Sequence, residues 1–476
     1  MSKSHSSTSV TRRQFLYYSA LASAGTAFIG CARPQPRRVS ANEKLNIAGV
    51  GVGGKGSSDL RCCSTENIVA LCDVNEASAA ATRQKYPQAK FYRDFREMLD
   101  KEKSIDAVDI ATADHMHAVI AATAIKMGKH VYCQKPLTHD VYEARVLRKL
   151  ADQYKVATQM GNQGSASDGL RRAVEVVHAG LIGPVREAYV WTNRPLWRQG
   201  LDRPEGSDPV PPTLDWNLWL GTAPYRPFKD KWPESVASSG RRDVYQPWVW
   251  RGWLDFGTGA LGDMACHTVN WPFRALKLEY PTEIEAECVG LTKEMYPTSS
   301  KIRFEFPARG NQPPVTLRWH DGGNKPSKEV TAGVADLLEK VSESGCILVG
   351  EKGELFSPDD GDGDFRFYAK LKGDKEFTRA TDHEAVKAIP QTIPRNLFKG
   401  GTDERQHAEW IAACKGGPPA YSNFDIAAYL TEIMLLGCVA MRTGKKLDWD
   451  GPKMCATNAP EAAQYVKRDY RKGWSL

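Results

Sequence analysis

Hydrophobic positions in the first third of the chain form short, continuous apolar runs separated by longer helical patterns. Apolar runs of strand length are typical of parallel strands that are buried on both faces. Strands that alternate with helices predict a doubly wound parallel sheet, which binds ligands at the carboxyl ends of its strands. The expected strands are 45–50, 68–72, 105–111, 130–133 and 156–160, and the expected helices are 118–127 and 140–154.

The pattern changes near residue 165, where strand-like runs follow one another with few helices between them. This order predicts a second, α+β domain with a large, open and mostly antiparallel sheet. We expect domains at 44–164 and 165–450, followed by a tail at 451–476. The expected elements of the second domain are a helix at 169–179, strands at 185–192, 283–291, 302–306 and 315–320, and a long amphipathic helix at 425–443.

The N-terminus has the pattern of an export signal. Residues 11–16 (TRRQFL) resemble a twin-arginine motif, and a weakly apolar, uncharged stretch follows up to Gly30. Cys31 stands where a lipoprotein is cleaved and lipidated. We therefore expect a signal peptide at 1–31, a linker at 32–43 and a periplasmic or extracytoplasmic location, with or without a lipid anchor on Cys31. The alternative is an ordinary signal peptide in which Cys31 is incidental.

Composition narrows the class of protein. The chain has 476 residues, enough for two domains, and its 25% of charged residues argues against wholesale disorder. The net charge of +7 is too small and too dispersed to indicate nucleic-acid binding. The 11 cysteines include no CxxC pair, and most lie in apolar segments, so they resemble small buried hydrophobes rather than a disulfide framework.

A glycine-rich loop follows the first expected strand. Gly51, Gly53 and Gly56 have GxGxxG spacing, which allows close approach of the backbone to a pyrophosphate at a helix N-terminus. A register at Gly49, Gly51 and Gly54 also fits. Asp73 ends the second strand and is placed to accept the ribose hydroxyls of NAD. A glycine-rich turn beside an unrelated acid is the plain alternative, and Lys55 and Asn75 leave some room for NADP.

A Lys-Pro step marks the reactive end of the expected nucleotide site. Lys135 follows the strand at 130–133, so its positive charge would meet the nicotinamide end. Together with the loop, this position indicates a redox enzyme. The candidate cofactor-binding residues are Gly51, Val52, Gly53, Gly54, Lys55, Gly56, Asp73, Val74, Thr112, His115, His117, Gln134, Lys135 and Asn162.

A second chemical motif lies on an expected helix at 259–276. Asp263 and His267 are four residues apart and therefore share a helix face. The carboxylate could orient the imidazole, whose ordinary pKa suits a general base. A helix cap and a buried histidine would give the same spacing. Since no cysteine or further carboxylate stands at ligand spacing, we expect no metal.

Most of the chain's 13 tryptophans gather between Trp191 and Trp271. Aromatic faces stack on sugar rings, and nearby charged groups bond sugar hydroxyls. For most of these tryptophans, packing of a long irregular segment is the better interpretation. The candidate substrate residues are Trp191, Arg194, Arg251 and Trp253.

Taken in order, the glycine loop, Asp73, residues 114–117 (DHMH), Lys135-Pro136 and Asp263-x-x-x-His267 resemble the Gfo/Idh/MocA oxidoreductases. The resemblance covers residues 44–450. It implies a Rossmann domain and a C-terminal α/β domain whose open sheet mediates oligomerisation. It further implies that Lys135 contacts substrate and nicotinamide ribose and that His267 is the acid or base, with Asp263 beside it. One departure is Gln134, which stands where the family usually has Glu.

These features predict an NAD-dependent oxidoreductase that acts on a sugar, glycoside or polyol hydroxyl. Export favours a tightly held cofactor and formation of a keto-sugar, since free NAD is scarce outside the cytoplasm. One alternative is a glycosidase that works by transient oxidation, elimination and re-reduction. Another is an exported sugar-binding protein that keeps NAD for structure. The expected partners are a carbohydrate substrate and further copies of the chain.

Overall fold

The computed structural model describes residues 33–236, 242–358 and 364–476, and residues 35–476 fold as one unit. The expected signal peptide and Cys31 lie outside the described residues. Arg37, in the expected linker, already contacts the folded unit, since its Nε lies 2.7 Å from Asp106 Oδ1. Val39 is buried beside it. The end of the linker is thus packed against the first sheet.

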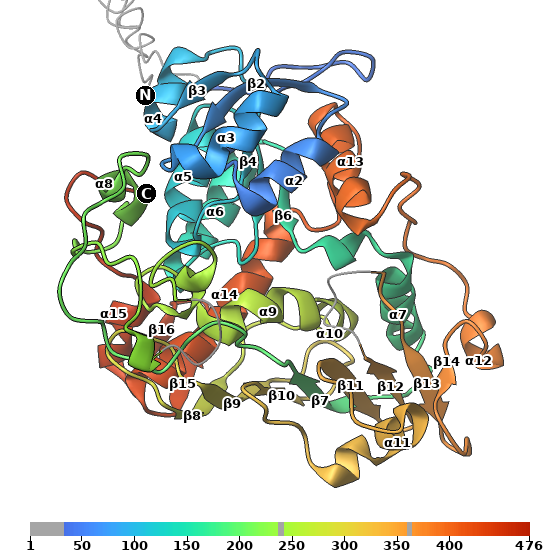
Figure 1. Ribbon diagram of the computed structural model, residues 1–476. Coiled ribbons are helices and arrows are strands. Elements are labelled where there is room, and N and C mark those ends of the chain that lie inside the picture. The colour runs from blue at the N-terminus through green and yellow to red at the C-terminus, as the bar shows by residue number, and fades with distance from the viewer. Residues whose placement is uncertain (1–32, 237–241, 359–363) are drawn as a thin grey trace, which may run out of the picture. The chain divides into compact units, whose positions relative to one another are not determined.

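The N-terminal half forms a six-stranded parallel sheet with the order β3-β2-β1-β4-β5-β6 (Figure 1). The central strands are buried on both faces, as their apolar runs predict. The Rossmann prediction is confirmed. The strands are β1 (Asn46–Val50), β2 (Asn67–Cys72), β3 (Lys90–Tyr92), β4 (Ala107–Ile110), β5 (His130–Gln134) and β6 (Thr158–Gly161), and the helices are α2 (Gly54–Cys62), α3 (Glu76–Lys85), α4 (Phe95–Lys101), α5 (Asp114–Lys126) and α6 (Val141–Tyr154).

The C-terminal half forms a ten-stranded sheet with the order β14-β13-β12-β11-β7-β10-β9-β8-β15-β16. β7 and β10 pair in parallel, whereas the other neighbours pair antiparallel, which confirms the expected second sheet. Its strands are β7 (Val185–Trp191), β8 (Glu283–Val289), β9 (Ser299–Phe306), β10 (Val315–His320), β11 (Gly345–Gly350), β12 (Gly353–Ser357), β13 (Tyr368–Leu371), β14 (Thr378–Arg379), β15 (Leu447–Asp450) and β16 (Cys455–Ala456).

Two short helices follow one another in the middle of the chain, where the sequence predicts one helix. The expected helix at 259–276 is divided into α9 (Gly259–Thr268) and α10 (Asn270–Ala275), with Pro272 in the first turn of α10. Proline is tolerated there because the first N–H groups of a helix have no partner within it. The remaining helices of this half are α7 (Asp168–His178), α8 (Trp216–Leu220), α11 (Lys328–Leu338), α12 (Glu384–Lys387), α13 (Thr402–Cys414), α14 (Phe424–Thr443) and α15 (Ala463–Val466).

Helix α14 lies between the two sheets, against α6 and α9, in Figure 1. Among the described residues, it is the one helix long and apolar enough to cross a membrane, with a mean hydropathy of 1.6. However, 83% of that apolar window is buried inside the fold. Such burial is what a core helix that joins two sheets requires.

A long irregular segment connects β7 with α9. Its described residues, 192–236 and 242–258, are called the aromatic insert below. Several large side chains, among them Trp216, Trp219 and Trp253, pack together in a core of their own within the insert. Trp216 and Trp219 stack with 4.7 Å between ring centroids. Apart from the short helix α8 and two 3-10 turns, the described part of the insert is thus held by aromatic packing, as the tryptophan content predicts.

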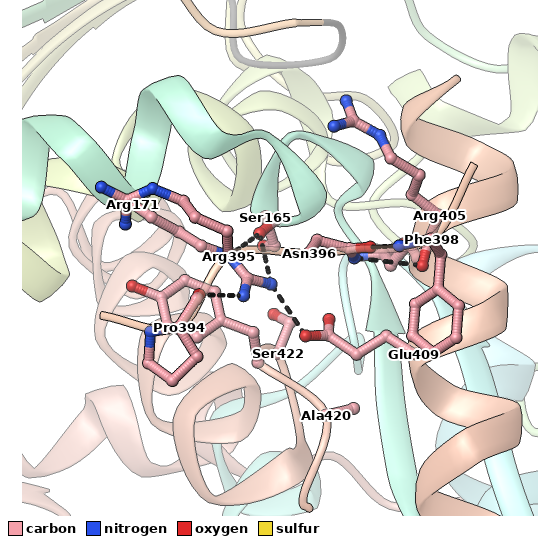
Figure 2. A network of polar contacts seen from close by, with 12 residues as sticks. Ser165, Arg171, Pro394, Arg395, Asn396, Phe398, Arg405, Glu409, Ala420 and Ser422 are labelled. Atoms are coloured by element: carbon pink, nitrogen blue, oxygen red, sulfur yellow. Dashed lines mark hydrogen bonds and ion pairs between the residues drawn. The ribbon is translucent and has the colours of Figure 1, made fainter. Parts of the chain in front are cut away.

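Helix α13 lies against α2, a helix of the N-terminal half that is far from it in the sequence (Figure 1). The irregular chain before it is fixed by buried Arg171 of α7, as Figure 2 shows. Arg171 Nη1 donates to the Pro394 carbonyl at 2.7 Å, and its Nη2 pairs with Glu409 of α13 at 2.8 Å. Charge-assisted hydrogen bonds of this kind fix the position of a segment that has no regular secondary structure.

Candidate active site

A pocket of about 530 Å³ opens at the carboxyl ends of the first sheet's strands. Its walls come from the glycine loop, the ends of β2, β4 and β5, α9 and the aromatic insert. The position agrees with the rule that doubly wound sheets bind ligands at the carboxyl ends of their strands. The glycine loop, Lys135 and His267 all line this one pocket.

The glycine loop begins directly after β1 and starts α2. Because β1 runs to Val50, Gly49 lies inside the strand and the loop begins at Gly51. Gly51 has a φ of +78°, and an added Cβ would lie 2.7 Å from the Ala111 carbonyl oxygen. An added Cβ at Gly54, by contrast, meets nothing within 4 Å. This open cradle at a helix N-terminus fits the pyrophosphate of a dinucleotide.

Asp73 follows β2 and lines the pocket. Its Oδ2 accepts hydrogen bonds from the backbone N–H groups of Val52, at 2.9 Å, and Gly53, at 3.3 Å. Burial raises the pKa of Asp73, and the backbone N–H groups oppose that effect. The carboxylate thus holds the glycine loop in place at the edge where a ribose is expected.

Lys55 and Asn75 are both engaged within the protein. Lys55 Nζ lies 2.8 Å from Asp59 Oδ1 and 2.7 Å from Asp403 Oδ1. The Asn75 side chain caps α3 by accepting bonds from two backbone N–H groups. Neither side chain is therefore free for a 2′-phosphate, which favours NAD over NADP.

The structure gives a physical reason for Gln134. Its Nε2 donates to Asp59 Oδ2 at 2.8 Å, and Asp59 is completely buried. A glutamate at this position would bring a second carboxylate against Asp59, whereas the amide donates a hydrogen bond. Gln134 therefore supports the base of the glycine loop, and the partner of Lys135 lies elsewhere.

Beneath Gln134, His407 of α13 packs against β5 of the first sheet. Its ring stacks on Tyr132 with 4.1 Å between centroids, and its Nε2 lies 3.5 Å from Asp109 and 3.7 Å from Asp59. Burial lowers the pKa of His407, but the hydrogen bond to Asp109 and the nearby carboxylates outweigh burial and raise it well above its usual range. The imidazolium and the Lys55 ammonium together thus balance the two buried carboxylates.

The same region contains two groups of metal-ligand type within 4.8 Å, namely Cys63, Asp109 and His407, and Asp59, Asp403 and His407. The Lys55 ammonium already pairs with Asp59 and Asp403. We therefore interpret these side chains as an ion-pair network. The expectation of no metal stays a prediction.

Lys135 is fixed against α9. Its Nζ donates to Asp263 Oδ1 at 2.9 Å, and Arg251 Nε donates to the same oxygen at 2.8 Å. Burial alone would raise the pKa of Asp263, but the charges of Lys135 and Arg251 hold it well below its usual range. An ionised carboxylate therefore places two cations on the pocket wall.

The expected pairing of Asp263 with His267 stays a prediction. Both residues lie on α9, and the Oδ1 atom of Asp263 binds Lys135 and Arg251. His267 is buried, lies one turn further along α9 and lines the pocket. Asp263 positions Lys135 in the structure, and the roles of Lys135 and His267 stay predictions.

A second buried carboxylate, Asp114, lies behind this group and was not a sequence candidate. Its Oδ2 accepts a bond from Thr258 Oγ1 at 2.9 Å. Burial raises its pKa to about 7, with Arg251 opposing and Asp263 reinforcing the shift. Two carboxylates close in space thus hold different protonation states near neutral pH. Because its neighbours come from distant segments, spacing alone could not reveal this difference.

Other predicted cofactor residues divide between the pocket wall and the layer beneath it. His117 contacts the Pro136 and Thr112 carbonyl oxygens, at 2.8 and 3.1 Å, and burial lowers its pKa to about 4. Asn162 donates to the Cys266 carbonyl at 3.1 Å. Both are buried outside the pocket lining, as are Val52 and Gly56, whereas Gly51, Gly53, Gly54, Lys55, Asp73, Val74, Thr112, His115, Gln134 and Lys135 line it.

Two of the four substrate candidates lie away from the pocket, so those predictions need correction. Trp191 is fully buried in the second sheet, and its Nε1 donates to the Ser342 carbonyl. Trp253 is fully buried inside the aromatic insert. Both serve packing because their strand and insert positions face a core. Arg194 and Arg251, in contrast, line the pocket.

Sequence reasoning missed the aromatic residues that line the pocket. Trp197, Trp248 and Trp250 surround Arg251, whose guanidinium carbon lies 4.3 Å from the Trp250 ring centroid. Phe95 and Trp474 lie at another part of the wall. The tryptophan content indicated the insert but not which of its tryptophans line the pocket. Trp474 stands in the tail, far from every motif.

Comparisons with known proteins agree with this architecture. The description "Oxidoreductase family, NAD-binding Rossmann fold" (GFO_IDH_MocA) matches residues 45–162, and the family's C-terminal alpha/beta domain matches residues 185–310. Together the two matches cover just over half of the chain.

Curated relatives match over part of their length. Inositol 2-dehydrogenase of Salmonella typhimurium is 30% identical over 140 residues, which cover 28% of this chain and 41% of the relative. Levoglucosan dehydrogenase of Pseudarthrobacter phenanthrenivorans is 28% identical over 203 residues, or 42% of this chain and 40% of the relative. The chain thus spans about two fifths of the length of these relatives.

Solved structures share the fold over most of the chain. The aldose-aldose oxidoreductase of Caulobacter crescentus has a TM-score of 0.55 and 14% identity, and the match covers 86% of this chain and all of that one. The WlbA dehydrogenase of Bordetella pertussis, solved with NADH and UDP-GlcNAcA, has a TM-score of 0.56 and 13% identity, with 86% and 99% covered. With its glycine loop, its two sheets and both family matches, the chain belongs to the Gfo/Idh/MocA family of oxidoreductases.

Proposed function

We propose that the protein oxidises a hydroxyl group of a sugar, glycoside or polyol, with NAD as the hydride acceptor. The observation that carries this proposal is the Lys135–Asp263–Arg251 group, which lies with His267 in the pocket that also contains the glycine loop. A dinucleotide held by the loop would extend along this pocket toward these side chains. The arrangement suits removal of a proton and a hydride from one carbinol group.

Each side chain has a distinct task in the proposed reaction. Lys135, held by Asp263, donates a hydrogen bond to the substrate oxygen and stabilises negative charge that develops there. His267 accepts the hydroxyl proton. Asp263 is unsuited to act as the base, because its pKa is held well below the usual range. NAD, when bound, supplies the acceptor for the hydride.

The aromatic residues around Arg251 support a carbohydrate substrate. Trp197 and Trp248 meet edge to face, with 5.4 Å between ring centroids, and both line the pocket. Trp248 has a φ of +71°, an unusual backbone for a bulky residue and one that concentrates at functional sites. Flat aromatic faces beside arginine donors match the C–H faces and hydroxyls of a sugar ring. The relatives named as inositol and levoglucosan dehydrogenases support the same substrate class.

The proposal includes a resident cofactor, a keto-sugar product and an extracytoplasmic location. The twin-arginine pattern at residues 11–16 supports export in the folded state, and Cys31 supports a lipid anchor. A protein that leaves the cytoplasm with its NAD would need to retain it. The open ten-stranded sheet supports assembly of several copies.

Product analysis tests this function. Purified protein is incubated with myo-inositol, levoglucosan and a panel of glycosides, while nicotinamide absorbance and product mass are followed. Nicotinamide reduction with a product two mass units lighter and an intact glycosidic bond is the expected result. A cleaved sugar without net reduction would replace this proposal with redox-assisted glycoside cleavage. Substrate binding without any reduction across the panel would support a sugar-binding protein instead.

A further inference from the structure

The last ten residues of the tail, 467–476, lie against α5, the start of α6 and the aromatic insert. Residues 467–476 contain no regular element, yet strong contacts fix them. Arg468 Nε lies 2.9 Å from Asp140 Oδ2 at the start of α6, and Arg468 Nη2 donates to the His115 carbonyl at 3.1 Å. Arg471 Nη2 donates to the Asn217 carbonyl at 2.7 Å. The tail therefore has a defined path that links α5, α6 and the aromatic insert.

This path brings Trp474 to the pocket wall. Trp474 lies beside Phe95, with 6.2 Å between ring centroids and 30° between planes. The guanidinium of Arg96, on α4, lies 4.4 Å from the Trp474 ring centroid. The Trp474 backbone N–H donates to the Arg471 carbonyl at 3.1 Å, which connects the indole to the anchored part of the tail. Trp474 is half-buried, so part of its ring stays accessible.

The surroundings of Trp474 identify which end of the pocket it lines. Phe95 begins α4 immediately after β3, and β3 is the edge strand beside β2. Asp73, at the end of β2, faces the expected ribose, whereas Lys135 lies beyond β4 on the other side of the glycine loop. A dinucleotide whose pyrophosphate occupies the loop would therefore direct its adenine toward Phe95 and its nicotinamide toward Lys135.

We propose that Trp474 forms an aromatic wall of the adenine site and that the anchored tail retains NAD in the protein. The indole and Phe95 offer flat apolar surface, and an adenine ring is the part of NAD that such surface recognises. Arg468 and Arg471 keep the indole in place when the site is open to solvent. The inference rests on the proposed use of NAD and adds the residue that slows its release.

Release of NAD from the purified holoenzyme tests the inference. Trp474→Ala is expected to release NAD about 10- to 100-fold faster than the unchanged protein, from the usual contribution of base–aromatic stacking. Trp474→Phe keeps a flat ring and is expected to stay within a few-fold. Lys472→Ala alters an exposed neighbour in the same tail and serves as the matched control. Release rates unchanged in Trp474→Ala would overturn the proposal.

Two fragments of the cofactor separate a local contact from general damage. After NAD has been removed, AMP binding should weaken in Trp474→Ala by a similar factor, while nicotinamide mononucleotide binding should stay the same. Equal losses for both fragments would show a structural role and overturn the assignment to the adenine site. Neither measurement requires turnover, so an absence of sugar oxidation would count against the proposed function and leave this inference intact.

Discussion

The two ends of the pocket are built by different means. At the nicotinamide end, Lys135 and Arg251 pair with the buried carboxylate of Asp263, and the three residues come from the chain after β5, from the aromatic insert and from α9. At the adenine end, Phe95 and Trp474 form an apolar wall between α4 and an irregular tail. Charged groups need fixed partners when they are buried, whereas apolar rings need only surface. The proposed chemistry therefore depends on paired charges around α9, whereas retention of the cofactor depends on a segment without regular secondary structure.

Loss of Lys135 should break the nicotinamide end and spare the adenine end. Lys135→Met removes the ammonium that faces the substrate oxygen, and hydride transfer is expected to fall about 1,000-fold. NAD release should stay near the original rate, because Trp474 and Phe95 are untouched. Single-turnover nicotinamide reduction and release of bound NAD measure the two effects. Lys126→Met, at an exposed position of α5, is the control. Near-normal turnover in Lys135→Met would remove Lys135 from the mechanism.

The glycine loop joins the two ends, and Gln134 supports its base. Gln134→Glu places a second carboxylate beside buried Asp59 and should lower the free energy of unfolding by about 3 kcal/mol at pH 8. Repulsion raises the pKa of the introduced carboxyl in the folded state, so the loss should shrink as the pH falls toward 5. Denaturant unfolding at both pH values checks this.

Two variants control the Gln134 prediction. Gln84→Glu introduces the same charge at an exposed position of α3 and should change stability little. Adding Asp59→Asn to Gln134→Glu restores an amide–carboxylate pair and should recover part of the loss. A loss that is independent of pH would contradict the electrostatic explanation.

Ionisation of Asp114 gives a prediction for the charged end of the pocket alone. Its folded pKa of about 7 lies above the ordinary value, so its ionisation destabilises the folded state as the pH rises from below 5 to above 7. Asp114→Asn imitates the protonated acid. Between pH 5 and pH 8, the free energy of unfolding of this variant should fall by about 2 kcal/mol less than that of the original protein. Thermal unfolding across this range measures the difference. Asp100→Asn, an exposed substitution, should show no such divergence.

The smallest effect is expected at Phe95. Phe95→Leu keeps apolar volume but removes the ring that lies beside Trp474, so NAD release should accelerate about two- to five-fold. Turnover with saturating NAD should stay within two-fold. Phe398→Leu changes an exposed phenylalanine far from the pocket lining and serves as the control. A larger effect on turnover than on NAD release would show that the two ends are not independent.

The first sheet and the charged part of the site were largely predictable from sequence. Continuous apolar runs located every strand of the first sheet except the short edge strand β3. Strand ends in a parallel sheet meet at one edge, so Asp73 and Lys135 could be placed at the same edge. Periodicity also placed Asp263 and His267 on one helix face. It could not show that Lys135 and Arg251 both bind the Asp263 carboxylate, because the position of Arg251 depends on how the aromatic insert packs.

The rest could not be predicted because its contacts lack any local pattern. Trp191 and Trp253 carry the same residue type as Trp197 and Trp248, but only packing decides which rings face a core. The short strands β11 to β14 pair antiparallel in a segment without a clear alternation. Trp474 reaches the pocket through arginine contacts that join positions hundreds of residues apart.

The packing of His407 against the first sheet has a consequence for the order of folding. Asp59 and Asp109 are buried in the N-terminal half, yet the imidazolium that faces them arrives from α13, about 300 residues later. Contacts of such sequence separation form late, since the chain between them must first be ordered. The Rossmann half should therefore stay incompletely packed until α13 docks. A fragment that ends near residue 164 would lack this counter-charge, so the two sheets are separate layers of structure but one unit of folding.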